Sequence, residues 1–262
     1  MTSIQTGVPR VEAHAVSYRY SDGTTALHEI SVQVTQGEIV AVLGRSGAGK
    51  STLMRCLAGL AAPTSGRVLH DGVDHRTLRR GAKRRAHARV GLVFQEFQLV
   101  DRATVLSNAL IGRLAYQRSL PSLLHYVRRG DREIAVDSIR RLGLEDQLRK
   151  RADALSGGQR QRVAIARALA QQPDMLLADE PVANLDPVLA RGVIDDIVRL
   201  ARIEGLTAVL NLHDVELARH VADRLVGLRA GKLAFDRPTG SVTTADLDLL
   251  YADTERELMG AP

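Results

Sequence analysis

The segment Gly44-Arg-Ser-Gly-Ala-Gly-Lys50-Ser51 contains residue types whose spacing is suited to holding phosphate groups. It fits the P-loop pattern G-x-x-x-x-G-K-[ST], follows the apolar run Ile39–Leu43 and precedes a stretch with helical spacing. Glycines allow successive backbone N–H groups to converge on phosphate oxygens, while a helix start adds partial positive charge. Lys50 would reach the β and γ phosphates, and the Ser51 hydroxyl would ligate magnesium. A simple glycine-rich turn does not require the Lys-Ser pair, so this segment predicts nucleotide binding.

Two carboxylates follow a second apolar run, in the sequence Met175-Leu-Leu-Ala-Asp179-Glu180. An α/β sheet binds its ligand at the carboxyl ends of its strands, so this segment is interpreted as a Walker B strand. Asp179 would hold magnesium through water, and Glu180 would orient the water that attacks the γ-phosphate in line. Acidic residues also end strands merely because they face solvent, but the P-loop upstream favours the catalytic interpretation.

A second helix start of unusual composition lies at Leu155-Ser-Gly-Gly-Gln159. The apolar residues after it recur with helical spacing, so Ser156 and the glycines are expected to open a helix. By itself, Ser-Gly-Gly is an ordinary junction between a loop and a helix. Gln159 precedes Asp179 by 20 residues in a chain that already has a P-loop, and this order makes the motif informative.

The elements that must position these motifs indicate a mixed α/β fold with a covered parallel sheet. Residues 39–43, 175–178 and 207–212 are short apolar runs typical of buried parallel strands. Residues 50–60 should form the helix that follows the P-loop, because Pro63 and Gly66 lie just beyond it.

The remaining segments have different patterns. Residues 11–35 alternate between apolar and polar side chains around Ser21-Asp22-Gly23, which predicts a small antiparallel sheet. Residues 66–73, with an Asp71-Gly72 turn, could extend that sheet. Residues 101–151 have a helical and charged pattern.

Composition narrows the class of protein. With 262 residues and 45% hydrophobic content, we expect one compact domain. No apolar run approaches the roughly 18 residues of a membrane helix, and residues 1–10 lack the apolar stretch of a signal peptide, so we expect a cytosolic chain. Cys56 is the sole cysteine, which excludes an internal disulfide, and its apolar surroundings predict a packed helix face without a catalytic role.

The formal charge of +6 admits nucleic acids, anionic lipid or phosphate-bearing ligands as partners. Lysine occurs only four times, so most of the 36 basic residues are arginines, many of them clustered in residues 79–89. Aromatic residues make up only 3% of the chain and Trp is absent, which removes the stacking residues of single-strand binders. A solvated arginine-rich surface is therefore the preferred interpretation, and nucleic acid is a minor alternative.

The P-loop, the segment Leu155–Gln159 and the Asp179-Glu180 pair follow one another in the order found in the ABC ATPase family, which the chain resembles. In that family Leu-Ser-Gly-Gly-Gln is the signature motif. The resemblance covers residues 11–236. Gln95 resembles the Q-loop glutamine, Asn184-Leu-Asp186 the D-loop, and His213 the switch histidine that contacts the γ-phosphate. Tyr20 resembles the aromatic residue that stacks on adenine, although Tyr18 would serve nearly as well. The chain departs from the family pattern at Asn184 and Ala178, neither of which is a reacting group.

The motifs and the resemblance together imply ATP and Mg²⁺ as cofactors and a full set of site residues. Catalysis is expected from Glu180, His213 and Gln95, and magnesium binding from Ser51, Gln95 and Asp179. Nucleotide contacts are expected from Tyr20, Gly44, Arg45, Ser46, Gly47, Ala48, Gly49, Lys50, Ser51, Thr52, Ser156, Gly157, Gly158, Gln159 and Asp186.

The implied fold class is α/β: a P-loop NTPase (RecA-like) core with a mostly parallel sheet, an N-terminal antiparallel β subdomain and an α-helical subdomain. Residues 1–262 would form a single ABC ATPase domain, with the β subdomain at about 9–36 and 66–76 and the helical subdomain at about 101–165. The resemblance further implies a head-to-tail, ATP-dependent homodimer on the cytoplasmic face of the inner membrane. Its partners would be membrane permease subunits and, through them, an extracytoplasmic solute-binding protein, with no nucleic acid.

The cargo is indicated only by finer resemblance. Residues 112–133, the segment Leu142-Gly-Leu, and the sequences around Ala178 and Leu212 resemble ATPases of phosphonate importers. Import of phosphite, phosphate or amino acids remains an alternative, as does a single-cassette ATPase of lipoprotein release or cell division. Ribosome-acting members have two fused cassettes and DNA-repair members a long coiled coil, and this chain has neither pattern.

Overall fold

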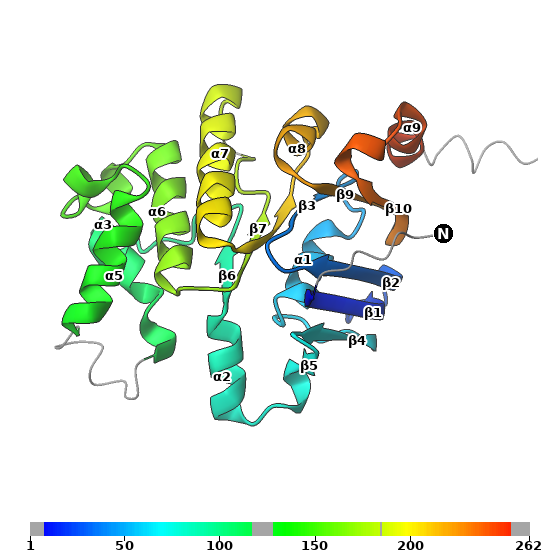
Figure 1. Cartoon of the computed structure of the whole chain (residues 1–262), viewed down its shortest axis with the longest axis horizontal. Coiled ribbons are helices and arrows are strands. Elements are labelled where there is room, and N and C mark those ends of the chain that lie inside the picture. The colour runs from blue at the N-terminus through cyan, green and yellow to red at the C-terminus, as the bar shows by residue number, and fades with distance from the viewer. Residues whose placement is uncertain (1–7, 117–127, 184, 253–262) are drawn as a thin grey trace, which may run out of the picture.

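The computed structural model describes residues 8–116, 128–183 and 185–252, and a six-stranded sheet lies at its centre (Figure 1). The strand order is β10-β9-β3-β8-β7-β6, and all neighbours are parallel except β10, which is antiparallel to β9. The strands are β3 (Ile39–Leu43), β6 (Val90–Val93), β7 (Met175–Asp179), β8 (Thr207–Asn211), β9 (Arg224–Arg229) and β10 (Lys232–Pro238). The three buried parallel strands expected from sequence are thereby confirmed.

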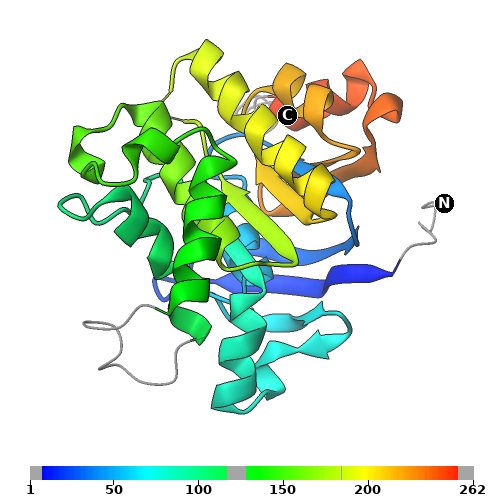
Figure 2. The same cartoon turned by 60° about the vertical axis from the view of Figure 1, so that its left-hand side comes forward.

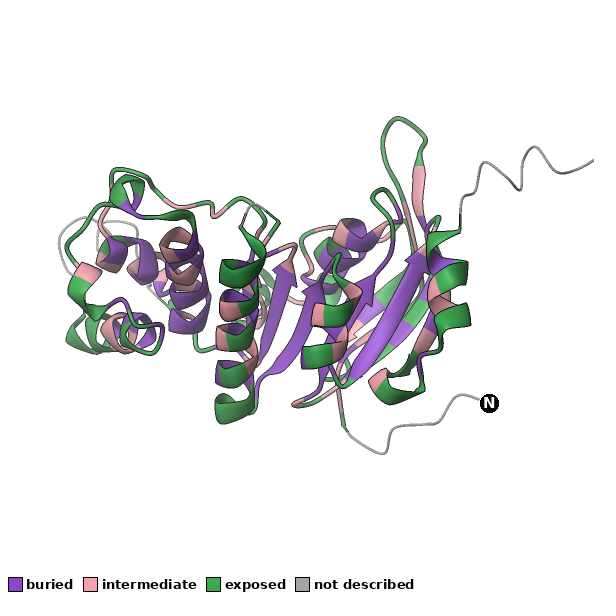
Figure 3. Cartoon of the chain, turned by 90° about the horizontal axis from the view of Figure 1, so that it is seen from above, coloured by how far each residue is buried: buried purple, intermediate pink, exposed green. Residues whose placement is uncertain are grey.

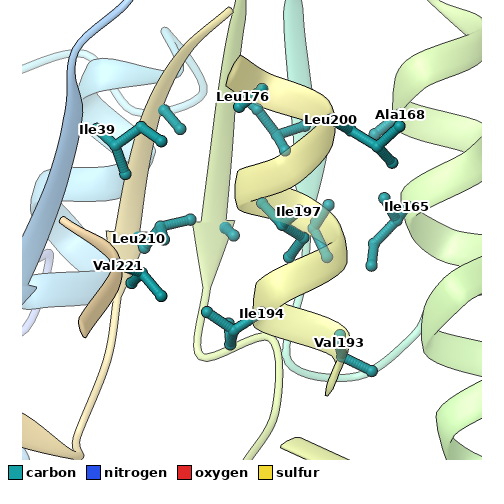
Figure 4. Packing of buried hydrophobic residues seen from close by; sticks show 14 of the residues in the cluster. Ile39, Ile165, Ala168, Leu176, Val193, Ile194, Ile197, Leu200, Leu210 and Val221 are labelled. Carbon is teal, nitrogen blue, oxygen red and sulfur yellow. The ribbon is translucent and has the colours of Figure 1, made fainter. Parts of the chain in front are cut away.

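Both faces of this sheet are covered, which explains why its strands are apolar runs without alternation. In β3, Ile39 and Ala41 belong to the core under the helices, whereas Val40 and Val42 belong to the core on the opposite face. The five parallel strands are therefore buried nearly throughout (Figure 3), whereas the antiparallel edge strand β10 is mostly exposed. Ile194, Ile197 and Leu200 of one covering helix pack onto the first face (Figure 4).

A second sheet is antiparallel, with strand order β2-β1-β4-β5. Its strands are β1 (Pro9–Arg19), β2 (Thr25–Thr35), β4 (Ser65–His70) and β5 (Val73–Asp74). The P-loop helix α1 (Lys50–Leu57) contacts β1 and β2 on one side and β7 and β8 on the other, so it lies between the two sheets. The short η1 (His75–Thr77) and α2 (Arg80–Ala88) connect this sheet back to β6.

Three helices that pack on one another form the opposite end of the molecule (Figures 1 and 2). They are α3 (Val105–Ile111), α5 (Arg129–Arg140) and α6 (Gly157–Ala170), with 3-10 turns η2 (Leu114–Tyr116), η3 (Glu145–Gln147) and η4 (Ala152–Ala154). The helices α7 (Pro187–Glu204) and α8 (Val215–Val221) cover the core sheet, and η5 (Thr239–Ser241) and α9 (Thr244–Tyr251) follow β10.

Two expectations need correction in detail. The helix expected over residues 50–60 ends at Leu57, because Gly59 adopts φ 71° and turns the chain. The helical character expected from 101 to 151 is confirmed, but the region is divided into α3, α5 and short 3-10 turns, and a backbone bridge between Thr104 and Arg151 joins its two ends. Of the segment 112–133 that resembled phosphonate importers, residues 117–127 lie outside the described residues. The α/β fold class is confirmed.

Within the described residues, no helix has the length and apolar character needed to cross a membrane.

Candidate functional site

The backbone of the P-loop has a conformation that two of its glycines make possible. Gly44 has φ 151°, and a Cβ atom there would lie 2.2 Å from the carbonyl oxygen of Leu228. Gly49 has φ 98°, and its Cβ would lie 2.5 Å from the carbonyl oxygen of Ala26. The loop is therefore pressed between β9 and the start of β2, which leaves no room for side chains at these positions.

Lys50 is buried at the first position of α1. Its Nζ donates hydrogen bonds to the carbonyl oxygens of Gly44 at 2.8 Å and Arg45 at 3.1 Å, so the ammonium lies directly over the loop. Burial lowers the pKa of Lys50, while the nearby carboxylates of Glu180 and Asp179 oppose that shift. A buried cation beside convergent amides is suited to a polyphosphate anion.

The Walker B strand brings its first carboxylate to the P-loop helix. Asp179 Oδ1 accepts a hydrogen bond from the Ser51 hydroxyl at 3.0 Å and another from Asn211 Nδ2 at 2.6 Å. A hydroxyl and a carboxylate at this separation offer hard oxygen ligands, which fits a magnesium ion that keeps several of its waters. Sequence reasoning did not single out Asn211, whose only signal is a polar residue within the apolar run 207–212.

Glu180 and His213 also meet, although 33 positions separate them in the sequence. His213 Nε2 lies 2.8 Å from Glu180 Oε1, with the histidine half exposed and the glutamate mostly buried. Glu180 has φ 47°, a left-handed conformation that is uncommon for a residue with a side chain. The strand end thus turns sharply and directs this carboxylate toward the loop that follows β8.

Tyr20 lies just beyond the end of β1, and its hydroxyl is 2.8 Å from the Thr52 hydroxyl of α1. Tyr18 packs against the core and meets Tyr20 edge to face, with ring centroids 5.0 Å apart. Tyr20 is the more exposed of the two rings, so it is the better placed to stack on a base.

The signature segment forms the start of α6. Ser156 is the N-cap: its Oγ accepts from the Gln159 backbone N–H at 3.4 Å, and Gln159 Oε1 accepts from the Ser156 N–H at 3.1 Å. This capping box satisfies two of the free amides of the helix start. Leu185 lies over the motif, since a Cβ on Gly157 would be 3.2 Å from its Cδ2.

The expected site residues Gln95 and Asp186 lie in other segments and have no hydrogen bond to the P-loop among the described residues. Gln95 follows β6 and is exposed. Arg167 of α6 donates to the carbonyl oxygens of Phe97 and Gln98, which fixes the chain after Gln95 to the signature helix. Asp186 caps α7 through its contacts with the N–H groups of residues 188 and 189, and Asn184 lies outside the described residues.

The remaining P-loop residues differ in exposure: Arg45, Ser46 and Gly47 are exposed, whereas Ala48 is buried. Cys56 is buried on α1, which confirms the expected packed position, and burial raises the pKa of its thiol to about 11.

The structure therefore brings the P-loop helix, Asp179, Glu180 and His213 together, while the signature begins α6, which packs on α3 and α5 as well as on β6 and α7. Among the described residues, no three His, Cys, Asp or Glu side chains form a metal-binding group. This finding does not bear on the expected magnesium ligands Ser51, Gln95 and Asp179, of which only Asp179 is of those types.

The family model described as ABC transporter matches residues 27–183. A phosphonates import ATP-binding protein PhnC of Alcaligenes faecalis is 46% identical over 92% of this chain and 87% of its own length. The structure of cbiO1 from Clostridium perfringens, part of the ABC transporter complex cbiONQ, has a TM-score of 0.78 and 28% identity over 97% of this chain and 99% of that one.

A third similar protein is the ATP-binding cassette MJ0796, whose dimeric post-hydrolysis structure contains ADP and Pi. It has a TM-score of 0.76 and 30% identity, and the match covers 87% of this chain and 98% of that one. The order of the motifs, the arrangement of the sheets and these similarities agree. The chain belongs to the ABC transporter family.

Proposed function

We propose that the chain is the ATP-binding subunit of an ABC importer, which hydrolyses ATP to power the uptake of phosphonates through a separate permease. One observation supports the use of ATP: Ser51, Asp179, Glu180 and His213 come from three distant segments and meet beside one P-loop. The cargo is supported by relatives named phosphonates import ATP-binding proteins, which are 41–47% identical over most of the chain.

In the proposed site, the triphosphate lies along the P-loop, where backbone N–H groups and Lys50 bind its oxygens. Ser51, Asp179 and Gln95 would hold Mg²⁺, which shields the charge of the β and γ phosphates. Tyr20 would stack on adenine from its exposed position beside Thr52. The other nucleotide contacts of this chain are proposed at residues 44–52.

Glu180 is proposed to orient the attacking water and accept its proton. Its contact with His213 Nε2 at 2.8 Å supports this role, because the histidine keeps the carboxylate turned toward the loop after β8. His213 would also contact the γ-phosphate, so that one side chain links the base to the group that is transferred. Gln95 would report the presence of magnesium and water to the segment fixed by Arg167.

The assembly is proposed to be a head-to-tail dimer in which residues 156–159 and Asp186 of one copy meet the ATP held by the other. The dimeric MJ0796 structure, which is similar to this chain, supports a dimer. We infer a peripheral position on the cytoplasmic face of the membrane, permease subunits as direct partners and a solute-binding protein as an indirect partner. The β subdomain at about 9–36 and 66–76 and the helical subdomain at about 101–165 would move as parts of this single cassette.

A growth experiment tests the cargo. A strain without the gene should fail to grow with an alkylphosphonate as its sole phosphorus source, yet it should grow on orthophosphate. The Lys50→Ala protein should not restore growth, because the phosphate-binding ammonium is lost. Lys83→Ala is the matched control, since Lys83 is exposed on α2, and it should restore growth fully.

Uptake of radiolabelled phosphonate should follow the same pattern. Parental uptake in the deletion strain would overturn the cargo but not the ATPase. Loss of phosphite, phosphate or amino-acid uptake instead would identify one of the alternative cargoes. If the deletion instead impaired lipoprotein release or cell division, the chain would have a different partner.

A further inference from the structure

Asn211, the last residue of β8, is fully buried beside the proposed catalytic carboxylates. Its Nδ2 donates to Asp179 Oδ1 at 2.6 Å, the shorter of the two hydrogen bonds that this oxygen accepts. The orientation of the amide follows from chemistry, because a carboxylate oxygen requires a donor and the reversed amide would place two oxygens in contact. Asn211 Oδ1 therefore points away from Asp179.

The other half of this amide has no partner. Asn211 Oδ1 is buried and accepts no hydrogen bond from any described residue. Asn211 also lines a cavity of about 700 Å³ together with Glu180 and His213. A buried carbonyl oxygen without a donor is costly, so such groups in native proteins usually bind water or a ligand. The oxygen itself is buried, so the one polar contact of this side chain with the described residues is the Nδ2 hydrogen bond to Asp179.

Asp179 is likewise satisfied on one oxygen only. Both hydrogen bonds that it accepts end on Oδ1, and within the described part of the chain nothing donates to Oδ2. Two donors on one oxygen fix the rotation of the carboxylate and leave the second oxygen free for a ligand. Residues that hydrogen-bond to a metal ligand, without binding the metal themselves, usually fix the orientation of that ligand.

We propose that Asn211 is a positioning residue for the magnesium of this site: its Nδ2 fixes the Asp179 carboxylate, so that Asp179 Oδ2 stays free to face the metal or one of its waters. The inference rests on the proposed use of ATP and Mg²⁺ but not on the cargo. Asn211 acts through Asp179, so it is distinct from the residues that contact nucleotide. A purely structural role would instead affect stability alone.

The test compares Asn211→Leu, which keeps the branched shape and the number of side-chain heavy atoms but removes both polar atoms, with Thr207→Val as the matched control. Thr207 lies on the same strand as Asn211 and is equally buried. It accepts a hydrogen bond from the Gly37 N–H at 3.0 Å, and it pairs with Met175 at the opposite end of β7 from Asp179. Equilibrium binding of a fluorescent ATP analogue is titrated with magnesium, and thermal unfolding is followed with the nucleotide alone and with magnesium added.

In Asn211→Leu, the magnesium concentration for half-maximal binding should rise about tenfold to a hundredfold, as for the loss of other groups that orient metal ligands. Binding without magnesium should be unchanged, because Lys50 and the loop are intact. Thr207→Val should lower the melting temperature yet keep the parental magnesium titration. Asn211→Ser, which is too short to reach Asp179, is the second variant if the leucine protein does not fold, with the same expected shift.

A parental magnesium titration in a folded Asn211 variant would overturn the inference while the proposed function stands. An equal shift in Thr207→Val would also overturn it, because the effect would then follow from general destabilisation. If the parental protein bound the analogue equally well with and without magnesium, the proposed magnesium site and this inference would both fail.

Discussion

The two helices whose starts are proposed to meet ATP, α1 and α6, begin in opposite ways. The N-cap of α1 is Gly49, which has a left-handed backbone and provides no side chain to cap the helix. The N-cap of α6 is Ser156, which forms a reciprocal capping box with Gln159. A helix start has several unpaired N–H groups, so α1 leaves its amides available to an anion whereas α6 already satisfies two of its own.

This difference indicates an order of events in the proposed cycle. The P-loop can bind a triphosphate within one chain, because Lys50 lies over the loop and Ser51 meets Asp179 beside it. The signature start is stable without ligand, so it would serve as a rigid surface that is presented to nucleotide held by another copy. Binding would therefore come first and dimer closure second, and the two steps should be separable by mutation.

The largest expected effect is on ATP hydrolysis at the site beside α1. Glu180→Gln keeps the size of the side chain but removes the base, so ATP turnover should fall by at least about a hundredfold. ATP binding should persist, because Lys50 and Ser51 are unchanged, and the dimer should accumulate in ATP. A steady-state phosphate assay and size-exclusion chromatography measure the two effects, and near-normal turnover would reject the proposed role of Glu180.

The next prediction separates the two helix starts. Ser156→Arg places a bulky cation at the start of α6, so the ATP-dependent dimer should be lost. Binding of ATP by the monomer should stay within about twofold of the parental value, since α1 is untouched. Size exclusion with ATP in the Glu180→Gln background shows the first effect, and equilibrium nucleotide binding shows the second. A dimer that still forms would contradict the proposed position of the signature.

Sequence reasoning succeeded where local pattern determines structure. The run Ile39–Leu43 forms β3 with the expected bounds, and α6 begins directly after Ser156. Buried strands between glycine-rich turns, and a helix start with its own cap, are encoded by neighbouring residues. The juxtaposition of Ser51 and Asp179 was also expected, because both follow parallel strands and such strand ends share one edge of a sheet.

The features that sequence reasoning missed depend on distant segments. Asn211 contacts Asp179 only because β8 and β7 are neighbours in register. Arg113 pairs with Asp131 in the buried helical part, and no spacing rule connects those two positions. The cargo is a different case: its binding site is proposed to lie on partner proteins, in which case no contact within this chain encodes it.

As the pH decreases, α1 should lose stability at a higher pH than α6, because three histidines pack against the end of α1. His70 stacks on His75 with ring centroids 4.2 Å apart, and His87 lies beside His75. Burial, together with nearby His75, His87 and Arg10, lowers the pKa of His70 to about 4, against an opposing hydrogen bond with the Leu57 backbone. Burial also lowers the pKa of His75 and His87. The helix α6 contains no histidine.

The unfolded state binds a proton on His70 near pH 6.5, and the folded state only near pH 4, so stability falls as the pH decreases between these values. At pH 5 the loss from His70 is about 2 kcal/mol, or about a thirtyfold increase in opening. Hydrogen exchange at pH 7 and pH 5 should show this for amides of α1 and not for those of α6. His70→Phe, which keeps a stacked ring, should reduce the difference to the part that His75 and His87 contribute, and equal acid sensitivity of both helices would contradict the prediction.

The smallest effect tests the cap itself. Ser156→Ala removes the hydroxyl that accepts the Gln159 amide, which should lower the free energy of unfolding by about 1 kcal/mol. Thr243→Ala is the matched control, because Thr243 and Asp246 form the same capping box at the start of α9. Both variants should therefore lose a few degrees of melting temperature, about 2–4 °C for a protein of this size.

Only Ser156→Ala should also weaken the ATP-dependent dimer, because its hydroxyl has a second use at the proposed interface while that of Thr243 does not. The comparison thus separates a cap that only stabilises its helix from a cap that also presents the helix to a ligand. Equal dimerisation of the two variants, measured in the Glu180→Gln background, would mean that the serine hydroxyl acts only within its own helix. The glycines and amides of residues 157–159 would then have to make the contact with ATP alone.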